Sequence, residues 1–340
     1  MRLIERVWFG DSAADQAGRV LLAPLELVYR GAVQIRSELY DSGLIRTERA
    51  SIPVVSIGNV TVGGTGKTPV AAWIASRLAA VGKSPAIVLR GYGGDEPLVH
   101  ARLNPAVPVI VNADRNAGIR DAAAAGADVV VLDDAFQHRR AGRDADVVLV
   151  SADDWTGRQH LLPAGPYREP LGAIRRASLV VITRKSAPDV KVTAVEEAIS
   201  EAAPGLPTAV IGLTTSEIVA TGDTETRLPV TALAGKSVTA VAAIGNPDAF
   251  FRQLEAAAAK VTRMAFPDHH SFSPADISTI LRAGERANYI VCTLKDAVKL
   301  EPLWPAGKSR LWYVSLAVNV EHGGAVIDEM LERLGRHEGT

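Results

Sequence analysis

Short apolar runs alternate with amphipathic or alanine-rich stretches along most of the chain. Runs rich in β-branched residues predict buried strands, and apolar residues spaced three and four positions apart predict helices. Over residues 1–212 the predicted strands are 52–57, 85–89, 107–111, 128–132, 146–150 and 179–182. The predicted helices are 69–81, 115–125 and 192–203, after a helical region at 20–39. Strands that are apolar throughout and alternate with helices indicate a doubly wound, mostly parallel sheet covered on both faces.

The pattern changes at 213–233, where Thr, Glu, Ile and Val alternate without helical periodicity, as in a short hairpin or an inter-domain linker. A second α/β set follows, with strands at 238–244, 289–293 and 311–314 and helices at 248–259, 274–282 and 326–334. The length of 340 residues also exceeds the usual size of one hydrophobic core. We therefore predict a larger domain over 1–212, a hairpin-like linker over 213–233 and a smaller α/β domain over 234–340.

Composition and charge narrow the classes of function. The chain is 47% hydrophobic and 22% charged, as expected of a folded globular protein. Lys plus Arg total 37 against 38 for Asp plus Glu, so no net positive field favours nucleic acid, and none is expected as a partner. Cys292 is the only cysteine, which excludes an internal disulfide and fits a cytoplasmic protein. The chain has no apolar run of transmembrane length and no secretory signal pattern at its N-terminus.

The predicted helix at 20–39 mixes apolar and basic residues. Leu21, Leu25, Val28 and Ile35 recur in a partly helical pattern, and Arg36 lies among them. This pattern fits a helix that lies on a membrane surface. On pattern alone, a helix packed on the domain core with arginines that extend to water fits better.

A glycine-rich segment follows the first predicted strand: Gly63-Gly64-Thr65-Gly66-Lys67-Thr68. A triphosphate needs converging N–H donors and a mobile cation, which a glycine turn before a helix N-terminus provides. Lys67 would reach the β- and γ-phosphates, and the Thr68 hydroxyl would bind Mg²⁺. Thr61 stands where the strict pattern has its first glycine. The alternative is a glycine-rich turn of purely structural importance, followed by a lysine by coincidence. If the segment binds phosphate, it predicts a P-loop NTPase-like fold.

Two carboxylates, Asp133 and Asp134, follow the apolar strand at 128–132. Carboxylates at the C-terminal end of a parallel strand resemble a Walker B element, which holds Mg²⁺ together with the P-loop hydroxyl. The alternative is a pair of turn-forming aspartates. A GTPase is disfavoured because the chain lacks an Asn-Lys-x-Asp loop. A partitioning ATPase is also disfavoured, because Val62 stands where the motif of those proteins has its first lysine.

The ordered motifs resemble those of the tetraacyldisaccharide 4′-kinase family, whose members phosphorylate a lipid A precursor. The family carries Ser or Thr at the position of Thr61. The segments that carry the resemblance are Ile57–Pro69, Arg90–Gly94, Gly94–Pro97, Asp133–His138, Leu162–Pro166, Arg168-Glu169, Gly245–Pro247, Asp268-His269 and Lys295–Lys299.

The resemblance implies an ATP- and Mg²⁺-dependent kinase that phosphorylates the 4′-hydroxyl of a lipid-linked disaccharide, tetraacyldisaccharide 1-phosphate. It implies Asp95 as the catalytic base, His269 as its partner and Lys67 on the phosphates. It also implies nucleotide contacts from Thr61, Val62, Gly63, Gly64, Thr65, Gly66, Lys67, Thr68, Arg90 and Gln137, and metal binding by Thr68, Asp133 and Asp134. The N-terminal helix would attach the enzyme peripherally to the cytoplasmic side of the inner membrane.

Two features depart from the family pattern. Asp95 follows Gly94 directly, whereas the family usually inserts many residues between these two motifs. Leu294 stands where the family usually has Glu. Two other functions stay open at this stage: a P-loop kinase with another sugar or lipid acceptor, and a nucleotide-dependent switch ATPase without an acceptor.

Overall fold

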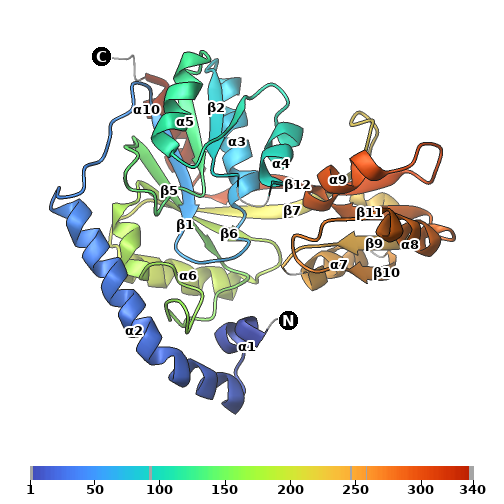
Figure 1. The fold of residues 1–340 in the computed structure, drawn as a ribbon, viewed down its shortest axis with the longest axis horizontal. Coiled ribbons are helices and arrows are strands. Elements are labelled where there is room, and N and C mark those ends of the chain that lie inside the picture. Colours follow the sequence, from blue (N-terminus) through green and yellow to red (C-terminus); the bar gives the residue numbers. More distant parts are fainter. Residues whose placement is uncertain (1–2, 92–93, 246, 258, 337–340) are drawn as a thin grey trace. The chain divides into compact units, whose positions relative to one another are not determined.

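The computed structural model describes residues 3–91, 94–245, 247–257 and 259–336. The chain divides into two compact units, shown in Figure 1. Unit 1 comprises Met1–Gly91, His100–Leu213 and Val318–Thr340, and unit 2 comprises Tyr92–Val99 and Thr214–Ala317. The chain passes from one unit to the other at both ends of the segment Tyr92–Val99 and within strands β7 (Thr208–Ala220) and β12 (Leu311–His322).

Unit 1 is built on a parallel sheet whose strands are almost entirely buried. In the order β7-β6-β5-β1-β4-β2-β3, each strand is parallel to its neighbour. The strands not yet bounded are β1 (Val54–Asn59), β2 (Pro85–Leu89), β3 (Val109–Val111), β4 (Val129–Asp133), β5 (Ala145–Ser151) and β6 (Leu179–Arg184). The chain builds outward from β1 in both directions, so the predicted doubly wound sheet is confirmed. Sheets of this kind bind ligands beyond the carboxyl ends of their strands, where the strand order reverses.

Helices cover both faces of this sheet (Figure 1). Apolar side chains of α3 (Lys67–Ala80) and α10 (Gly324–Arg336) share one core cluster with the central strands. On the other side, α5 (Arg115–Ala124) packs on β2 and β4, and α6 (Asp189–Ala202) packs on β5 and β6. The remaining helical elements here are α1 (Leu3–Phe9), α2 (Ala13–Asp41), α4 (Glu96–Leu103) and η1 (Leu171–Arg176).

Unit 2 is a smaller α/β unit, also with a parallel arrangement. Its strands lie in the order β10-β9-β11-β12, with β9 (Ser237–Ala242), β10 (Lys260–Ala265) and β11 (Tyr289–Thr293). Helix α7 (Pro247–Ala256) packs on one face, and α8 (Pro274–Gly284) and α9 (Leu294–Leu300) pack on the other. Strand β8 (Arg227–Pro229) pairs antiparallel with β7, which confirms the predicted hairpin; short 3₁₀ turns η2 (Val230–Leu233) and η3 (Glu301–Leu303) complete the unit.

The unit boundaries differ from the predicted domains 1–212, 213–233 and 234–340 in three places. Helix α10 packs in unit 1 because its apolar stripe, with Ile327 and Met330, joins the core around α3. Residues 92–99 cluster with unit 2, and the hairpin at 213–233 forms part of that unit instead of a separate linker. The sequence pattern also missed α1, α4, α9 and β10, which are short, and β10 lies at an edge with much of its surface exposed.

Candidate active site

The glycine-rich segment forms a loop between β1 and α3, at the carboxyl end of the central strand. Gly63 and Gly66 adopt positive φ angles of 118° and 87°, which side chains with a Cβ rarely tolerate. At Gly66 a Cβ would also overlap Leu213. The glycines are therefore required by the backbone path, as the phosphate-loop reading of the sequence predicts.

Side chains from neighbouring elements fix this loop. Asn59 Nδ2 donates to Thr65 Oγ1 at 3.0 Å, and Thr183 Oγ1 donates to the Thr65 carbonyl oxygen at 2.9 Å. The main-chain N–H of Val62 donates to the Pro166 carbonyl oxygen at 2.8 Å. Asn59, Thr65 and Thr183 are buried, so the loop conformation is set before any ligand binds.

The loop leaves room for an anion. A Cβ placed on Gly63 or Gly64 would meet no atom within 4 Å, so the backbone there is open to a ligand. Among the described residues, no side chain caps the N-terminus of α3, whose first N–H groups carry the positive end of the helix dipole. The site thus meets the two requirements of a phosphate: accessible N–H donors and a favourable field.

Asp133 and Asp134 lie beside this loop but have different surroundings. Asp133 ends β4 and is paired in register with Ile57 of the adjacent β1. Its carboxylate is buried, and Oδ2 lies 2.8 Å from His100 Nε2. Oδ1 is buried without a hydrogen-bond partner in the part of the chain that the structure describes.

Asp134 is partly exposed and is surrounded by cations. Arg168 Nη1 donates to its Oδ1 at 2.9 Å and lies 3.3 Å from its Oδ2. Lys67 Nζ lies 3.8 Å from Oδ1. Asp134 has a positive φ of 51°, a conformation that non-glycine residues seldom adopt, and this turns it away from the regular path of β4.

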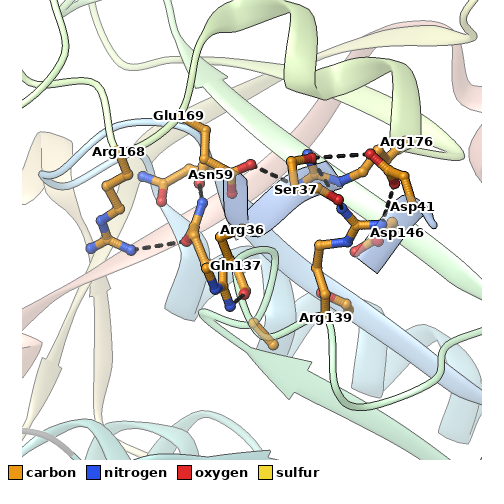
Figure 2. A network of polar contacts seen from close by, with 12 residues as sticks. Arg36, Ser37, Asp41, Asn59, Gln137, Arg139, Asp146, Arg168, Glu169 and Arg176 are labelled. Carbon is orange, nitrogen blue, oxygen red and sulfur yellow. Dashed lines mark hydrogen bonds and ion pairs between the residues drawn. The ribbon is translucent and has the colours of Figure 1, made fainter. Parts of the chain in front are cut away.

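Gln137 lies in the loop that follows Asp133 and Asp134, and it connects this loop to strand β1 (Figure 2). Its Nε2 donates to the Asn59 carbonyl oxygen at 2.8 Å, and its Oε1 accepts a weak hydrogen bond from Arg168 at 3.4 Å. Helix α2 supports the same loop, because Arg36 Nη2 donates to the Gln137 carbonyl oxygen at 2.6 Å. Arg139 in turn bonds Ser37 and Asp41 of α2, and this hydrogen bond holds the pKa of Asp41 below its usual range.

His138 follows Gln137 and is partly buried. Burial lowers the pKa of its imidazole, and the nearby positive charges of Arg115 and Arg143 lower it further. Both effects favour the neutral form of the ring.

Asp95 and His269 come together within unit 2. Asp95 is only 3% exposed, and its Oδ2 lies 3.5 Å from His269 Nδ1. Its Oδ1 is buried without a hydrogen-bond partner among the described residues. His269 has a positive φ of 57°, and its N–H donates to the Ala243 carbonyl oxygen at 3.2 Å. A buried carboxylate beside an imidazole is suited to accepting a proton.

The other predicted site residues have more varied surroundings. Arg90 is exposed at the end of β2, whereas Arg168, which was not among the predicted site residues, lies at the Asp134 carboxylate. Three residues of the predicted motifs lie outside the described residues: Tyr92 and Gly93 of the segment Arg90–Gly94, and Asn246 of the segment Gly245–Pro247. Sequence reasoning missed His100 altogether; its only signal was its position five residues after Asp95, in a helix that was not predicted.

The Lys295–Lys299 motif has a clear structural role. Asp296 is fully buried and accepts hydrogen bonds from the Ala243 N–H at 3.0 Å and from Thr293 Oγ1 at 2.7 Å. Lys299 Nζ lies 3.3 Å from its other oxygen and also donates to the His270 carbonyl oxygen at 3.3 Å. These bonds tie α9 to the segment that carries His269. Leu294 begins this helix and packs on the core without contributing charge.

Comparisons with known proteins agree across nearly the whole chain. A family model described as tetraacyldisaccharide-1-P 4′-kinase matches residues 18–335. The tetraacyldisaccharide 4′-kinase of Anaeromyxobacter sp. (strain Fw109-5) is 41% identical over 331 residues, covering 89% of this chain and 88% of that protein. That of Halorhodospira halophila (strain DSM 244 / SL1) is 38% identical over 355 residues, covering 98% of both chains.

A solved structure supports the same relationship. The crystal structure of LpxK from Aquifex aeolicus in complex with ATP matches with a TM-score of 0.74 and 29% sequence identity, covering 93% of this chain and 99% of that chain. The P-loop NTPase-like α/β fold predicted from the sequence is thereby confirmed. The chain belongs to the tetraacyldisaccharide-1-P 4′-kinase family.

Proposed function

We propose that unit 1 holds the triphosphate of ATP at the loop 60–66, and that the enzyme transfers the γ-phosphoryl group to the 4′-hydroxyl of a lipid-linked tetraacyldisaccharide 1-phosphate. Membership of the family makes the chain a phosphotransferase with an alcohol acceptor, in lipid A biosynthesis. The observation that carries the ATP site is the open backbone at Gly63 and Gly64 next to the uncapped α3. The related Aquifex aeolicus structure, which contains ATP, supports it.

The residues at the loop fit a magnesium ion. No cluster of three or more His, Cys, Asp or Glu suited to a metal occurs in the described part of the chain. Mg²⁺ does not need one, because it is usually held by one or two carboxylates, substrate phosphates and water. Asp133 offers a buried oxygen that has no hydrogen-bond partner among the residues that the structure describes, whereas both oxygens of Asp134 face Arg168. We therefore assign Asp133 and Thr68 as ligands and Asp134 as a partner of the cations.

Held by Asp133 and Thr68, a magnesium ion would supply positive charge that offsets the negative charge developing on the phosphates during transfer. Lys67 and Arg168 would supply further positive charge to the phosphates, each already oriented by Asp134. The loop N–H groups would hold the phosphates in place, so that catalysis depends mainly on positioning and electrostatics.

Asp95 is the proposed base for the acceptor hydroxyl. Its burial and its contact with His269 support this role. The proton would move from the 4′-hydroxyl to Asp95 as the new O–P bond forms and the bond from the γ-phosphorus to the bridging oxygen breaks, releasing ADP. His269 would orient the carboxylate and share the charge. Because the transition state is loose, this proton transfer comes late.

Peripheral membrane attachment through α2, on the cytoplasmic side of the inner membrane, is part of the proposal. The inward side of α2 is unusually polar: Asp15, Arg19 and Glu26 are its buried residues. Apolar side chains face outward instead and are 58% to 79% exposed, namely Val20, Leu21, Leu25, Leu27, Val28 and Ile35. No helix among the described residues has the length and apolar character needed to cross a membrane. A helix with its apolar side to solvent suits the surface of a bilayer, where acyl-chain substrates reside.

Substituting glutamate for both Leu21 and Val28 should weaken binding to phospholipid vesicles by about tenfold or more. Each substitution removes an apolar side chain whose burial in the lipid contributes roughly 1.5–3 kcal/mol. Cosedimentation with vesicles measures this. Val190→Glu is a matched control, since Val190 on α6 is 73% exposed against 72% for Val28. If the double variant and Val190→Glu lose vesicle binding equally, or if the double variant loses none, a specific role for α2 is refuted.

An acceptor panel tests the proposed reaction. Purified enzyme with Mg²⁺ and radiolabelled ATP is offered tetraacyldisaccharide 1-phosphate, the same disaccharide without its acyl chains, a monosaccharide acyl phosphate and water. Label should appear at the 4′-position of the first acceptor alone. ATP hydrolysis without labelled acceptor would favour a switch ATPase, and labelling of another acceptor would change the substrate.

A further inference from the structure

His100 and Asp133 form a buried, hydrogen-bonded pair at the C-terminal end of β4. His100 is 0% exposed and Asp133 is 2% exposed. Their single contact is the 2.8 Å bond between Nε2 and Oδ2, and within the described residues His100 Nδ1 and Asp133 Oδ1 are buried without hydrogen-bond partners. Such a pair contributes little to solubility or surface charge, so its placement calls for another explanation.

The hydrogen-bond geometry gives the two carboxylate oxygens of Asp133 different roles. With the imidazole proton on Nε2, the ring donates to Oδ2, and Nδ1 carries no proton that would lack an acceptor. Oδ2 is then occupied and the carboxylate cannot rotate freely. Oδ1 remains as the only oxygen of Asp133 free to bind a cation, and a buried carboxylate oxygen without a partner is otherwise costly.

The position of this pair in the fold also relates it to the proposed ATP and Mg²⁺ site. Asp133 is fixed by its register with Ile57 in β1, the strand that leads into the phosphate loop. His100 lies on α4, which begins immediately after Asp95. Groups that hydrogen-bond to a metal ligand orient it and tune its basicity, and their loss typically weakens metal affinity or activity by about 10- to 100-fold.

We infer that His100 is a positioning residue for the metal site: by holding Oδ2 of Asp133, it presents Oδ1 to the Mg²⁺ of the nucleotide complex. This inference rests on the proposed ATP and Mg²⁺ site. It assigns a role in the metal site to α4, the helix that begins directly after Asp95.

Magnesium titration of nucleotide binding tests the role. His100→Leu removes the donor and keeps an apolar side chain of similar size, whereas His100→Gln places an amide N–H near the position of Nε2. We expect His100→Leu to raise the Mg²⁺ concentration needed for half-maximal binding of a fluorescent ATP analogue by about 10- to 100-fold. His100→Gln should restore most of that loss, and affinity for the analogue in EDTA should be the same in all three proteins.

His160→Leu is the matched control, because His160 also bonds a carboxylate, that of Glu26, at 3.1 Å within unit 1. It should leave the magnesium titration unchanged. If His100→Leu does not fold, His100→Asn replaces it, since the shorter amide cannot reach Oδ2 and should show the same shift. Thermal denaturation of each variant separates lost folding from lost metal binding.

The outcomes distinguish this inference from the function on which it rests. Wild-type protein whose nucleotide binding ignores Mg²⁺ would contradict the proposed metal site itself. A wild-type protein that responds to Mg²⁺, together with His100→Leu and His100→Asn proteins that respond identically, would overturn the role of His100. A shift that His100→Gln does not reduce would show that the ring packs structurally and does not act as a donor.

Discussion

Replacing Asp95 by asparagine should lower kcat by about 10²- to 10⁴-fold, the usual effect of removing a general base. The amide retains the size of the side chain but cannot accept the proton of the acceptor hydroxyl. Asp95 belongs to a motif whose buried carboxylate has one oxygen 3.5 Å from His269 and the other without a hydrogen-bond partner among the described residues. ATP affinity should change little, because the groups assigned to the phosphates lie in unit 1. Steady-state kinetics and nucleotide binding on the same preparation measure both quantities.

Two further variants define the role of this pair. His269→Asn should lower kcat less than Asp95→Asn, because it removes the orienting group and leaves the base; asparagine also tolerates the positive φ of 57° at this position. Asp248→Asn is the control, since Asp248 is an exposed aspartate of unit 2 whose ion pair with Arg263, at 3.5 Å, contributes little. Asp95→Asn with wild-type kcat, or with a loss matched by Asp248→Asn, would exclude Asp95 as the base.

The sequence predicted the elements that local chemistry determines. The P-loop could be read because glycines at positive φ, a following lysine and an apolar strand before them are required together by one backbone path. The central strands were predicted because they are apolar throughout, as strands buried on both faces must be. The placement of Asp133 followed from its position at the end of such a strand.

What the sequence could not predict depends on contacts between distant segments. An amphipathic helix such as α10 shows which of its faces is buried but not which sheet it covers, so its assignment to the second domain was wrong. Arg168 reaches Asp134 from 34 residues away, so its motif could be recognised in the sequence but its partner could not. Helix α2 likewise reaches the site through contacts with distant segments: Arg36 bonds the Gln137 carbonyl oxygen and Tyr29 bonds the Arg168 carbonyl oxygen.

Lys67→Ala should produce the second large loss, about 10²- to 10³-fold in kcat, the effect expected when one preorganised donor to the transition state is removed. Lys67 begins α3, and its side chain is only 12% exposed, with Nζ 3.4 Å from the Gly63 carbonyl oxygen and 3.8 Å from Asp134 Oδ1. These contacts aim the ammonium group at the loop where the phosphates would bind. Removal also leaves Asp134 with less positive charge nearby, so its carboxylate would repel the nucleotide.

Single-turnover phosphoryl transfer measures this loss separately from ATP binding. Lys191→Ala serves as the control, because Lys191 in unit 1 also bonds a main-chain carbonyl, that of Asp153 at 3.2 Å, but belongs to α6. Lys67→Arg should remain impaired, since the planar guanidinium cannot replace a compact ammonium group at a confined phosphate contact. A Lys67→Ala enzyme with normal transfer and only a raised KM would mean that Lys67 binds ground state and transition state equally. The charge that drives transfer would then have to come from Arg168 and the metal site.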